Sequence, residues 1–313
     1  MLPADLGAEP EVRGPLGRQA TFAVVGPGGT YIARFPRDPS SLAVLRKEAR
    51  VTAGLRGRVS LRIPNTQVFE AGDVPPFALH EMIPGRSWFE IGAARLTGEP
   101  GTRLARDLAV FVRETHSVPL ETAAEWLGVD TRHSRWRAVL AARYGRPSWF
   151  AGERLERIRR RLAPTLPADL APLVEDTAAR YDRVVVSPDE LTFVHGDLHG
   201  GNLAFDADDV GPRLIGVFDF EAAGIMDYHY DFGRLNLIYD ALQDQVLEEY
   251  ARLDPDRPLD RDRVETCARA FVLYLLAEHI GDDGRVPPDR ADGFEHLVRL
   301  LREHVAYSES RGG

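Results

Sequence analysis

The chain has 313 residues, of which 44% are hydrophobic and 28% charged, and its formal net charge at pH 7 is −9. This balance is typical of a globular protein, and the excess of acidic residues argues against nucleic acid or an anionic membrane surface as the main partner. The single cysteine, Cys267, excludes a disulfide framework.

The composition also bears on where the protein works. No apolar run approaches the roughly 18 residues that a membrane span needs, and the N-terminal segment lacks the basic region and apolar core of a signal peptide. A chain with one cysteine suits a reducing compartment. We therefore expect a cytoplasmic protein that binds neither membranes nor nucleic acid. Its acidity is compatible with a cationic substrate, although solubility alone is the simpler explanation.

The N-terminal part of the chain predicts a small antiparallel sheet with one helix. Segments 19–25 and 30–35 are rich in β-branched and aromatic residues and flank the turn sequence Gly-Pro-Gly-Gly, which is typical of a hairpin. Apolar residues recur at intervals of three and four within 40–55, which predicts a helix with Ser40 or Ser41 as its N-cap. Segments 66–72 and 77–83 predict two further strands.

Amphipathic helices dominate the rest of the sequence. Segments 104–118 and 294–305 each place apolar residues on one helical face. Two short apolar strands, 191–194 and 213–218, interrupt this helical part, and each ends directly at a polar cluster. Because polar residues just beyond strand ends commonly face a cleft, we expect the functional site there.

These patterns together predict an α+β chain of two lobes. The smaller N-terminal lobe, residues 1–83, combines the antiparallel sheet with its helix. A hinge at about residues 81–86 leads into the larger, mainly helical lobe, residues 87–313.

The polar segment after the first of the two strands is His-Gly-Asp-Leu-His-Gly-Gly-Asn, residues 195–202. A metal-bound hydrolase, a phosphoryl-transfer loop and an ordinary polar turn are the three alternatives. His195 and His199 are four residues apart, but three glycines and a preceding strand indicate a loop, which excludes helical zinc ligation. Gly-Asp-Leu-His-Gly resembles one segment of the calcineurin-like metallophosphoesterases, whose other metal-binding segments are missing from this sequence.

Phosphoryl transfer fits this segment better. Asp197, then Asn202 five residues later, then Asp219 at the end of the next strand follow the spacing of a kinase catalytic loop and its metal-binding aspartate. In such a loop the first aspartate accepts the proton of the attacking hydroxyl. The asparagine and the second aspartate offer hard oxygen ligands to magnesium. The spacing therefore predicts Asp197 as the catalytic base and Asn202 and Asp219 as Mg²⁺ ligands.

The motifs resemble those of the aminoglycoside phosphotransferase family, which has a protein-kinase-like fold. HGDLHGGNLAFD is similar to the catalytic loop of that family, and GVFDFEAAGIMDYHYDFGRL to the segment that begins with its metal-binding aspartate. YIARFPR, LRKEA, FALHEMIPG and FVRETHSVP resemble further segments in the family's order, and the similarity extends from about Gly14 to Tyr239. The resemblance implies a Mg²⁺-dependent phosphotransferase with ATP or GTP as co-substrate.

The resemblance also implies a nucleotide site in the N-terminal lobe. Arg34 stands where the family usually has a lysine that contacts the α- and β-phosphates, and Glu48 is placed to pair with it. Arginine keeps the charge of lysine, but its reach and shape differ. The backbone of Glu81, Met82 and Ile83 is expected to bind the purine, and a loop at 14–22 is expected to cover the phosphates.

For several polar residues, a structural role is the alternative to a functional role. His195 and Asp231 are expected to support the catalytic loop through hydrogen bonds, and Asp227 has a similar ambiguity. Glu278 and Asp282 are candidates for binding a cationic substrate. A solvated charge at a helix end is the simpler interpretation of each of these two.

Departures from the protein-kinase pattern narrow the substrate class. Gly196 stands where a regulated kinase has arginine, Asp-Phe-Glu replaces Asp-Phe-Gly, and no Ala-Pro-Glu follows. A small hydroxylated molecule is therefore the expected acceptor: an aminoglycoside or another antibiotic, which would make the protein a resistance enzyme. A metabolite kinase of the choline, homoserine or sugar type is the alternative, and a non-catalytic nucleotide-binding module is another. Monomer and homodimer are both open.

Overall fold

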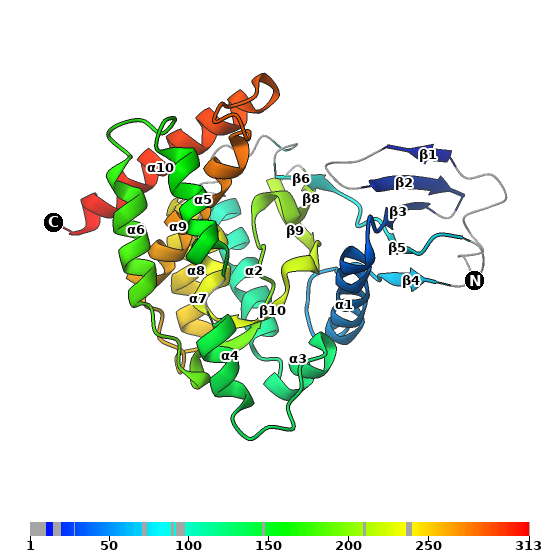
Figure 1. Ribbon diagram of the computed structural model, residues 1–313. Helices are drawn as coiled ribbons and strands as arrows, with labels where there is room; N and C mark the ends of the chain where they lie inside the picture. Colours follow the sequence, from blue (N-terminus) through cyan, green and yellow to red (C-terminus); the bar gives the residue numbers. More distant parts are fainter. Residues whose placement is uncertain are drawn as a thin grey trace.

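The computed structural model describes residues 11–14, 20–27, 29–70, 74–88, 91, 98–145, 148–208, 211–235 and 240–312. Figure 1 shows an N-terminal sheet on one side of the molecule and a larger group of helices on the other. The predicted α+β class, with an N-terminal antiparallel sheet and a mainly helical C-terminal part, is confirmed.

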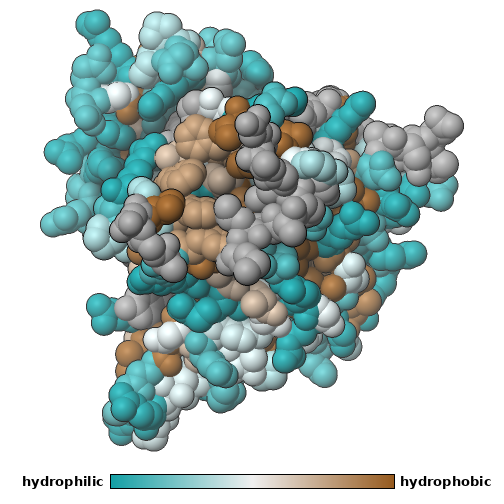
Figure 2. Space-filling model, turned by 90° about the vertical axis from the view of Figure 1, so that its right-hand side faces the viewer, coloured by the Kyte–Doolittle hydropathy of each residue, from teal (hydrophilic) through white to brown (hydrophobic). Residues whose placement is uncertain are grey.

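The N-terminal sheet is antiparallel at every junction between its described strands, with the order β1-β2-β3-β5-β4. Its strands are β1 (Glu11–Arg13), β2 (Ala20–Gly26), β3 (Gly29–Phe35), β4 (Gln67–Phe69) and β5 (Phe77–Glu81). β2 and β3 form the predicted hairpin, and Tyr31 of β3 pairs with Glu81 of β5. Figure 2 views the molecule from this side and shows hydrophobic residues gathered among hydrophilic ones.

Helix α1 (Pro39–Leu55) lies beside the sheet (Figure 1). The expected N-cap, Ser40 or Ser41, is wrong: Asp38 caps the helix, and its Oδ1 accepts the backbone N–H of Ser41 at 2.8 Å. A proline as the first helical residue needs no backbone donor, so the helix can begin earlier than the serines suggest. Leu45, Glu48 and Val51 are among the buried residues of this helix.

The C-terminal part is built around α9. Its described helices are α2 (Gly98–His116), α3 (Leu120–Leu127), α4 (Trp136–Tyr144), α5 (Gly152–Leu162), α6 (Pro172–Arg183), α7 (His229–Leu235), α8 (Asp240–Leu253), α9 (Arg261–His279) and α10 (Ala291–Gly312). Helix α9 packs against α5, α6, α7 and α10, while α2 packs against α8. Cys267 of α9 is buried. Among the described residues, no helix combines the length and apolar character of a membrane span.

Short strands and turns carry the polar clusters. The strands are β6 (Arg86–Ser87), β7 (Leu191–Val194), β8 (Leu203–Asp208), β9 (Gly211–Val217) and β10 (Gly224–Asp227), and β6-β8-β9 and β10-β7 are the sheets that they form. The 3-10 turns are η2 (Ser148–Phe150), η3 (Pro188–Glu190), η4 (Gly200–Asn202), η5 (Phe220–Ala222) and η6 (Pro288–Arg290). The backbone of Arg62, just after α1, pairs with β9 at Ile215 and Val217, which joins the two parts of the molecule.

Candidate active site

Two polar segments, one after β7 and one after β9, lie side by side. Leu203 pairs with Val217 in the β8–β9 hairpin, and the backbone N–H of Phe218 donates to the carbonyl oxygen of Asn202 at 3.0 Å. The residue after Phe218 is Asp219. The hairpin therefore brings the end of the 195–202 loop next to the start of the Asp219 segment.

Asp197 and Asn202 are in direct contact. The side-chain amide of Asn202 donates from Nδ2 to the backbone oxygen of Asp197 at 2.8 Å and to its carboxylate Oδ2 at 3.2 Å. Asn202 is buried. Because Nδ2 faces Asp197, the amide oxygen of Asn202 is turned away from that carboxylate and is the atom suited to bind a cation.

The carboxylate of Asp197 lies between a histidine and an arginine. His199 Nε2 is 3.6 Å from Oδ2, and Arg234 Nη1 is 3.4 Å from Oδ1. Burial raises the pKa of Asp197, but the His199 ring and the positive charge of Arg234 outweigh burial and lower the pKa to about 2. Asp197 is therefore ionised at neutral pH and can accept a proton or a hydrogen bond from a hydroxyl group.

Asp219 has an unusual backbone. Its φ of 67° makes it the single non-glycine residue with positive φ in the described part of the chain. Such conformations cost free energy and persist where the surrounding structure enforces them, often at functional sites. β9 ends two residues before Asp219, and the turn η5 follows immediately.

The donor atoms of Asn202 and Asp219 fit a magnesium ion. Mg²⁺ prefers oxygen ligands and commonly takes one or two from protein, with water and phosphate oxygens completing its shell. The described residues contain no group of three or more His, Cys, Asp or Glu side chains arranged to hold a metal. An ion bound partly through nucleotide phosphates does not require such a group.

His195 and Asp231 both brace the loop before Asp197. The carboxylate of Asp231 accepts the backbone N–H groups of His195 and Gly196, at 3.0 and 2.8 Å. His195 Nδ1 accepts the N–H of Asp197 at 3.2 Å, so Nε2 carries the proton and donates to the carbonyl of Phe218 at 3.2 Å. Burial lowers the pKa of His195, which favours this neutral form. One ring thus connects the two polar segments.

Arg34 and Glu48 form a buried ion pair between β3 and α1. Arg34 Nη1 lies 2.6 Å from Glu48 Oε2, and the two residues are 8% and 1% exposed. Arg34 also pairs with Glu221, two residues after Asp219. Burial raises the pKa of Glu48, against the opposing effect of Arg34. The contact between Arg34 and Glu48 follows the spacing seen in the sequence, but the contact with Glu221 was not expected.

Lys47 makes a second connection from α1 to the Asp219 segment. Its ammonium group donates to the backbone oxygens of Glu221 and Ala223. Burial lowers the pKa of Lys47. This role could not be predicted from the sequence, because Lys47 resembles an ordinary surface lysine in a charged helical stretch.

The segment that the sequence predicts as the hinge lines a cavity. Glu81, Met82 and Ile83 border a space of about 630 Å³, and Met82 N donates to the carbonyl of Thr30 at 2.8 Å. Neither Arg34 nor any residue of 195–202 lines this cavity. Most of the expected phosphate-covering loop, at 15–19, lies outside the described residues.

Glu278 and Asp282 contact arginines of α5. Glu278 Oε1 lies 2.6 Å from Arg157 Nη2, and Asp282 Oδ1 lies 2.6 Å from Arg161 Nη2. Neither carboxylate lines the two cavities at the 195–202 loop. The role of both residues in binding a cationic substrate stays a prediction.

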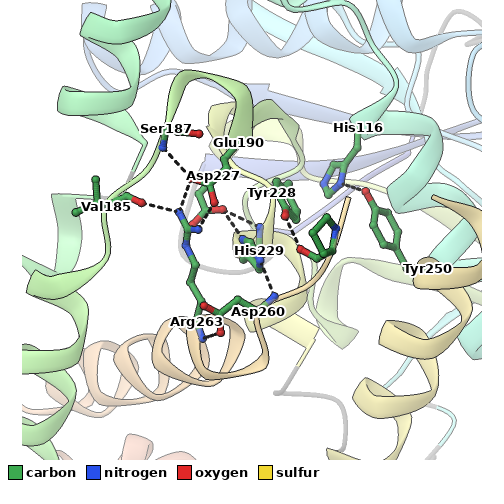
Figure 3. A network of polar contacts seen from close by, with 11 residues as sticks. His116, Val185, Ser187, Glu190, Asp227, Tyr228, His229, Tyr250, Asp260 and Arg263 are labelled. Atoms are coloured by element: carbon green, nitrogen blue, oxygen red, sulfur yellow. Dashed lines mark hydrogen bonds and ion pairs between the residues drawn. The ribbon is translucent and has the colours of Figure 1, made fainter. Parts of the chain in front are cut away.

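Asp227 belongs to a buried network behind the loop. Figure 3 shows it between Arg263 and His229. Arg263 Nε lies 2.7 Å from Asp227 Oδ2, and His229 Nδ1 lies 2.7 Å from Oδ1. The N–H of Asp260 donates to His229 Nε2 at 3.0 Å, so the Nδ1 proton of His229 points to Asp227. Arg263 also binds Glu190 at 2.5 Å, which connects α9 to the turn before β7.

Two cavities with shared lining residues lie at the 195–202 loop. One, of about 540 Å³, is lined by Asp197, His199 and parts of α9 and α10. The other, of about 660 Å³, is lined by Lys47, Gly196 and the segment after Asp219. Ala222 and Arg234 line both cavities. Arg234, like Lys47, was not singled out in the sequence.

Comparisons with known proteins show which family and which fold the chain resembles. A family model described as Phosphotransferase enzyme family matches residues 14–265. The structure of the GDP and kanamycin complex of APH(2")-IIIa has a TM-score of 0.64 and 23% sequence identity, with 96% of this chain and 93% of that chain covered. The predicted protein-kinase-like fold is thereby confirmed.

Two further solved structures are similar at lower identity. The macrolide 2'-phosphotransferase MphH from Brachybacterium faecium, as apoenzyme, has a TM-score of 0.59 and 18% identity, with 93% of this chain and 91% of that chain covered. The streptomycin–ATP ternary complex of APH(2")-IIa has a TM-score of 0.53 and 16% identity, with 94% and 91% covered. A search of curated protein sequences found no match.

Proposed function

The chain belongs to the phosphotransferase enzyme family, as its motifs predicted, and we propose that it transfers the γ-phosphoryl group of ATP or GTP to a hydroxyl group of a small molecule. The observation that carries this proposal is the hydrogen bond from Asn202 to Asp197, beside a hairpin that leads to Asp219. Similar solved structures are complexes with GDP or ATP, which supports a nucleotide co-substrate.

In the proposed reaction, Asp197 accepts the proton of the acceptor hydroxyl. The hydroxyl oxygen forms a bond to the γ-phosphorus while the bond from that phosphorus to the β–γ bridging oxygen breaks, and the nucleoside diphosphate leaves with the electron pair. A carboxylate with a pKa of about 2 is a weak base toward a free hydroxyl. Asp197 therefore first orients the hydroxyl, and the proton moves after the new bond to phosphorus has begun to form.

The nucleotide end of the site combines both parts of the molecule. Asn202 and Asp219 would hold Mg²⁺, which supplies positive charge against the phosphate oxygens. Arg34, fixed by Glu48, would contact the α- and β-phosphates. The backbone of the hinge at 81–83 would bind the base.

The acceptor class is proposed from the relatives and the motifs together. Kanamycin and streptomycin appear in the names of similar structures, and another similar protein is named as a macrolide phosphotransferase. An antibiotic with a free hydroxyl is therefore the first acceptor to test. A hydroxylated metabolite such as choline, homoserine or a sugar is the alternative, because the catalytic residues are the same for both classes.

Release of ADP and GDP in the presence of Mg²⁺ tests the proposal directly. Wild type and Asp197→Asn are compared across aminoglycosides, macrolides, choline, homoserine and sugars. Loss of the base predicts a decrease in kcat of about 10²- to 10⁴-fold with nucleotide affinity retained. Asp169→Asn is the matched control, because Asp169 is an exposed carboxylate paired with Arg302 on the surface.

The outcomes separate the candidate functions. Substrate-dependent release that disappears in Asp197→Asn and persists in Asp169→Asn supports the phosphotransferase. Release that persists in Asp197→Asn shows that this residue is not the base. Nucleotide binding without release, for every acceptor tested, supports a non-catalytic nucleotide-binding module instead.

A further inference from the structure

Arg234 is a buried arginine held among aromatic rings. Its guanidinium carbon lies 3.2 Å from the ring centroid of Phe271, 5.0 Å from that of Tyr230 and 5.3 Å from that of Trp149. The residue is 6% exposed. Arginine stays charged in such surroundings, and its planar group stacks on rings, so the rings fix the direction of the guanidinium.

Two of the guanidinium nitrogens lack a hydrogen-bond acceptor in the part of the chain that the structure describes. Arg234 Nη2 donates to the hydroxyl of Tyr230, but Nε and Nη1 have no hydrogen-bond partner among the described residues. Nη1 lies 3.4 Å from Asp197 Oδ1, close enough for ionic attraction without a hydrogen bond. Burying an arginine with unsatisfied donors costs free energy. A ligand with acceptor oxygens would satisfy these donors.

The cavities that Arg234 lines have a basic and aromatic character. Asp197 is the one carboxylate among the described residues that line either cavity. The basic lining residues are Lys47, His199, Arg234, His279 and His296. Phe271 and Tyr274 add aromatic surface beside Asp197. A polycationic acceptor would meet a fixed positive charge here, next to the base.

Within the described part of the chain, the carboxylates considered for binding a cation do not line these cavities. Glu278 and Asp282 bind Arg157 and Arg161, on the α5 side of α9. Glu221, which follows Asp219, pairs with Arg34. The acidic net charge of the chain is therefore not concentrated at the described walls of the two cavities that Arg234 lines.

We infer that the acceptor carries an anionic group, a carboxylate or a phosphate, that binds the guanidinium of Arg234 while its hydroxyl contacts Asp197. This inference rests on the proposed function for the identity of the reacting hydroxyl. Because Arg234 and Asp197 are 3.4 Å apart at their closest charged atoms, the hydroxyl and the anionic group lie within a few bonds of each other in the acceptor, as in a small hydroxy acid. The rings of Phe271 and Tyr274 would pack against the rest of the acceptor.

Matched pairs of acceptors test this specificity. Each pair keeps the carbon skeleton and removes the charge: glycerate with glycerol, glucose 6-phosphate with glucose, and 3-hydroxybenzoate with 3-hydroxybenzamide; kanamycin represents the polycations. The initial rate of nucleoside diphosphate release gives kcat/KM for wild type, Arg234→Gln, Arg234→Lys and Arg302→Gln. Arg302 is the matched control, since it is an exposed arginine on α10 that pairs with Asp169.

We expect Arg234→Gln to lose the preference for anionic acceptors. In wild type, kcat/KM for the anionic member of a pair exceeds that for the neutral member by about 10-fold or more, as charge-assisted hydrogen bonds predict. Arg234→Gln removes that preference mainly through KM, Arg234→Lys restores part of it, and Arg302→Gln leaves it unchanged. The glycerate and phosphate pairs show which anion the site prefers.

Two results would overturn the inference. A preference for neutral or cationic acceptors in wild type contradicts it. So does an equal decrease for both members of each pair in Arg234→Gln, which would mean that Arg234 only supports Asp197. Thermal unfolding of each variant shows whether a general loss of folding accounts for a decrease, and Arg234→Lys then decides the question, because it keeps the charge.

Binding without turnover separates this inference from the proposed function. Trp149 flanks the guanidinium, so its fluorescence reports titration with 3-hydroxybenzoate and with its amide, and Trp149→Phe identifies the signal. Tight binding of the benzoate that Arg234→Gln abolishes supports the anion site even if no acceptor is phosphorylated. Phosphorylation of kanamycin or choline, with no discrimination between benzoate and amide, supports the phosphotransferase and refutes the anion site.

Discussion

The carboxylate of Asp231 accepts the backbone N–H of Gly196 at 2.8 Å, so α7 fixes the residue that directly precedes the proposed base. The same carboxylate accepts the N–H of His195, and both of its partners come from one stretch of loop. A fully buried carboxylate is tolerated here because donors surround it. The position of Asp197 thus depends on a residue 34 positions away, as the numbering shows.

Asp231→Asn is expected to destabilise the fold. An asparagine offers one acceptor oxygen, so its amide group would face one of the two backbone donors. We expect the free energy of unfolding to fall by about 2–3 kcal/mol, measured from urea denaturation curves. Asp169→Asn, at an exposed ion pair, should change it by less than about 1 kcal/mol. Equal urea midpoints for Asp231→Asn and wild type would contradict the bracing role.

Gly196 and Gly57 form a natural pair for testing the loop. Both have positive φ, +80° and +74°. A Cβ at Gly196 would lie 2.5 Å from the carbonyl oxygen of Ala222, whereas a Cβ at Gly57 would have nothing within 4 Å. Gly57→Ala should therefore cost about 1–2 kcal/mol from backbone strain alone. Gly196→Ala should cost more and should also lower kcat, because the clash displaces the segment that follows Asp219.

Thermal unfolding and nucleotide turnover of the two alanine variants distinguish strain from collision. A larger decrease in melting temperature for Gly196→Ala, with a decrease in kcat that Gly57→Ala lacks, is the expected outcome. Similar melting temperatures for the two variants would show that the loop moves freely away from Ala222.

Substitutions of Arg34 should separate its charge from its shape. Arg34→Met leaves Glu48 buried without its partner, so we expect a loss of about 3–5 kcal/mol in stability and a higher KM for ATP and GTP. Arg34→Lys keeps the charge but cannot contact Glu48 and Glu221 through two separate nitrogens. It should keep activity within about 10-fold of wild type, since it restores the residue type usual in this family.

The control for Arg34, which lies on β3, is Arg46 on α1. Arg46→Met removes an arginine of α1 whose ion pair with Glu70 is exposed, and it should change stability by less than about 1 kcal/mol. The KM for ATP and GTP and the urea midpoint are measured for all three variants. An unchanged nucleotide KM in Arg34→Met would remove Arg34 from the proposed phosphate site.

The pH dependence of stability should reflect two buried histidines. Burial lowers the pKa of His116 and His195 below the ordinary value of 6.5. Below that pH the unfolded chain binds more protons than the folded chain, so stability decreases as the pH falls. The expected slope between about pH 6.5 and about pH 5 approaches 1.4 kcal/mol per pH unit for each histidine, a rough upper bound.

Urea denaturation across that pH window measures the slope. His116→Gln should reduce it, because one of the two titrating groups is gone. His133→Gln, at an exposed position, should leave it unchanged. A free energy of unfolding that stays constant from about pH 6.5 to about pH 5 would mean that neither histidine is held neutral by the fold.

The sequence predicted those contacts of the candidate site that form between segments close to one another in the chain. Asp197, Asn202 and Asp219 lie within one stretch of chain closed by the β8–β9 hairpin, so spacing alone placed them together. The contact between Arg34 and Glu48 follows from a strand and the helix directly after it. Their roles in binding magnesium, nucleotide and acceptor stay predictions.

Contacts between distant helices could not be predicted in this way. Arg234 packs on Phe271, which belongs to α9, and its sequence neighbours give no sign of that ring. Asp282 looks like a free charge at a helix end, but Arg161 of α5 lies against it. The capping of α1 by Asp38 was missed for a simpler reason: two adjacent serines gave an equally good local signal.

The backbone conformation of Asp219 has a consequence for attempts to engineer this protein. At φ 67°, glycine would fit with less strain than aspartate, which carries the proposed metal-binding charge. A library of variants selected for thermal stability alone would therefore favour replacement of this aspartate, and the selected variants would be stable but inactive. Each round of selection for stability should be followed by a screen for turnover, so that stabilising substitutions are kept at positions other than 219.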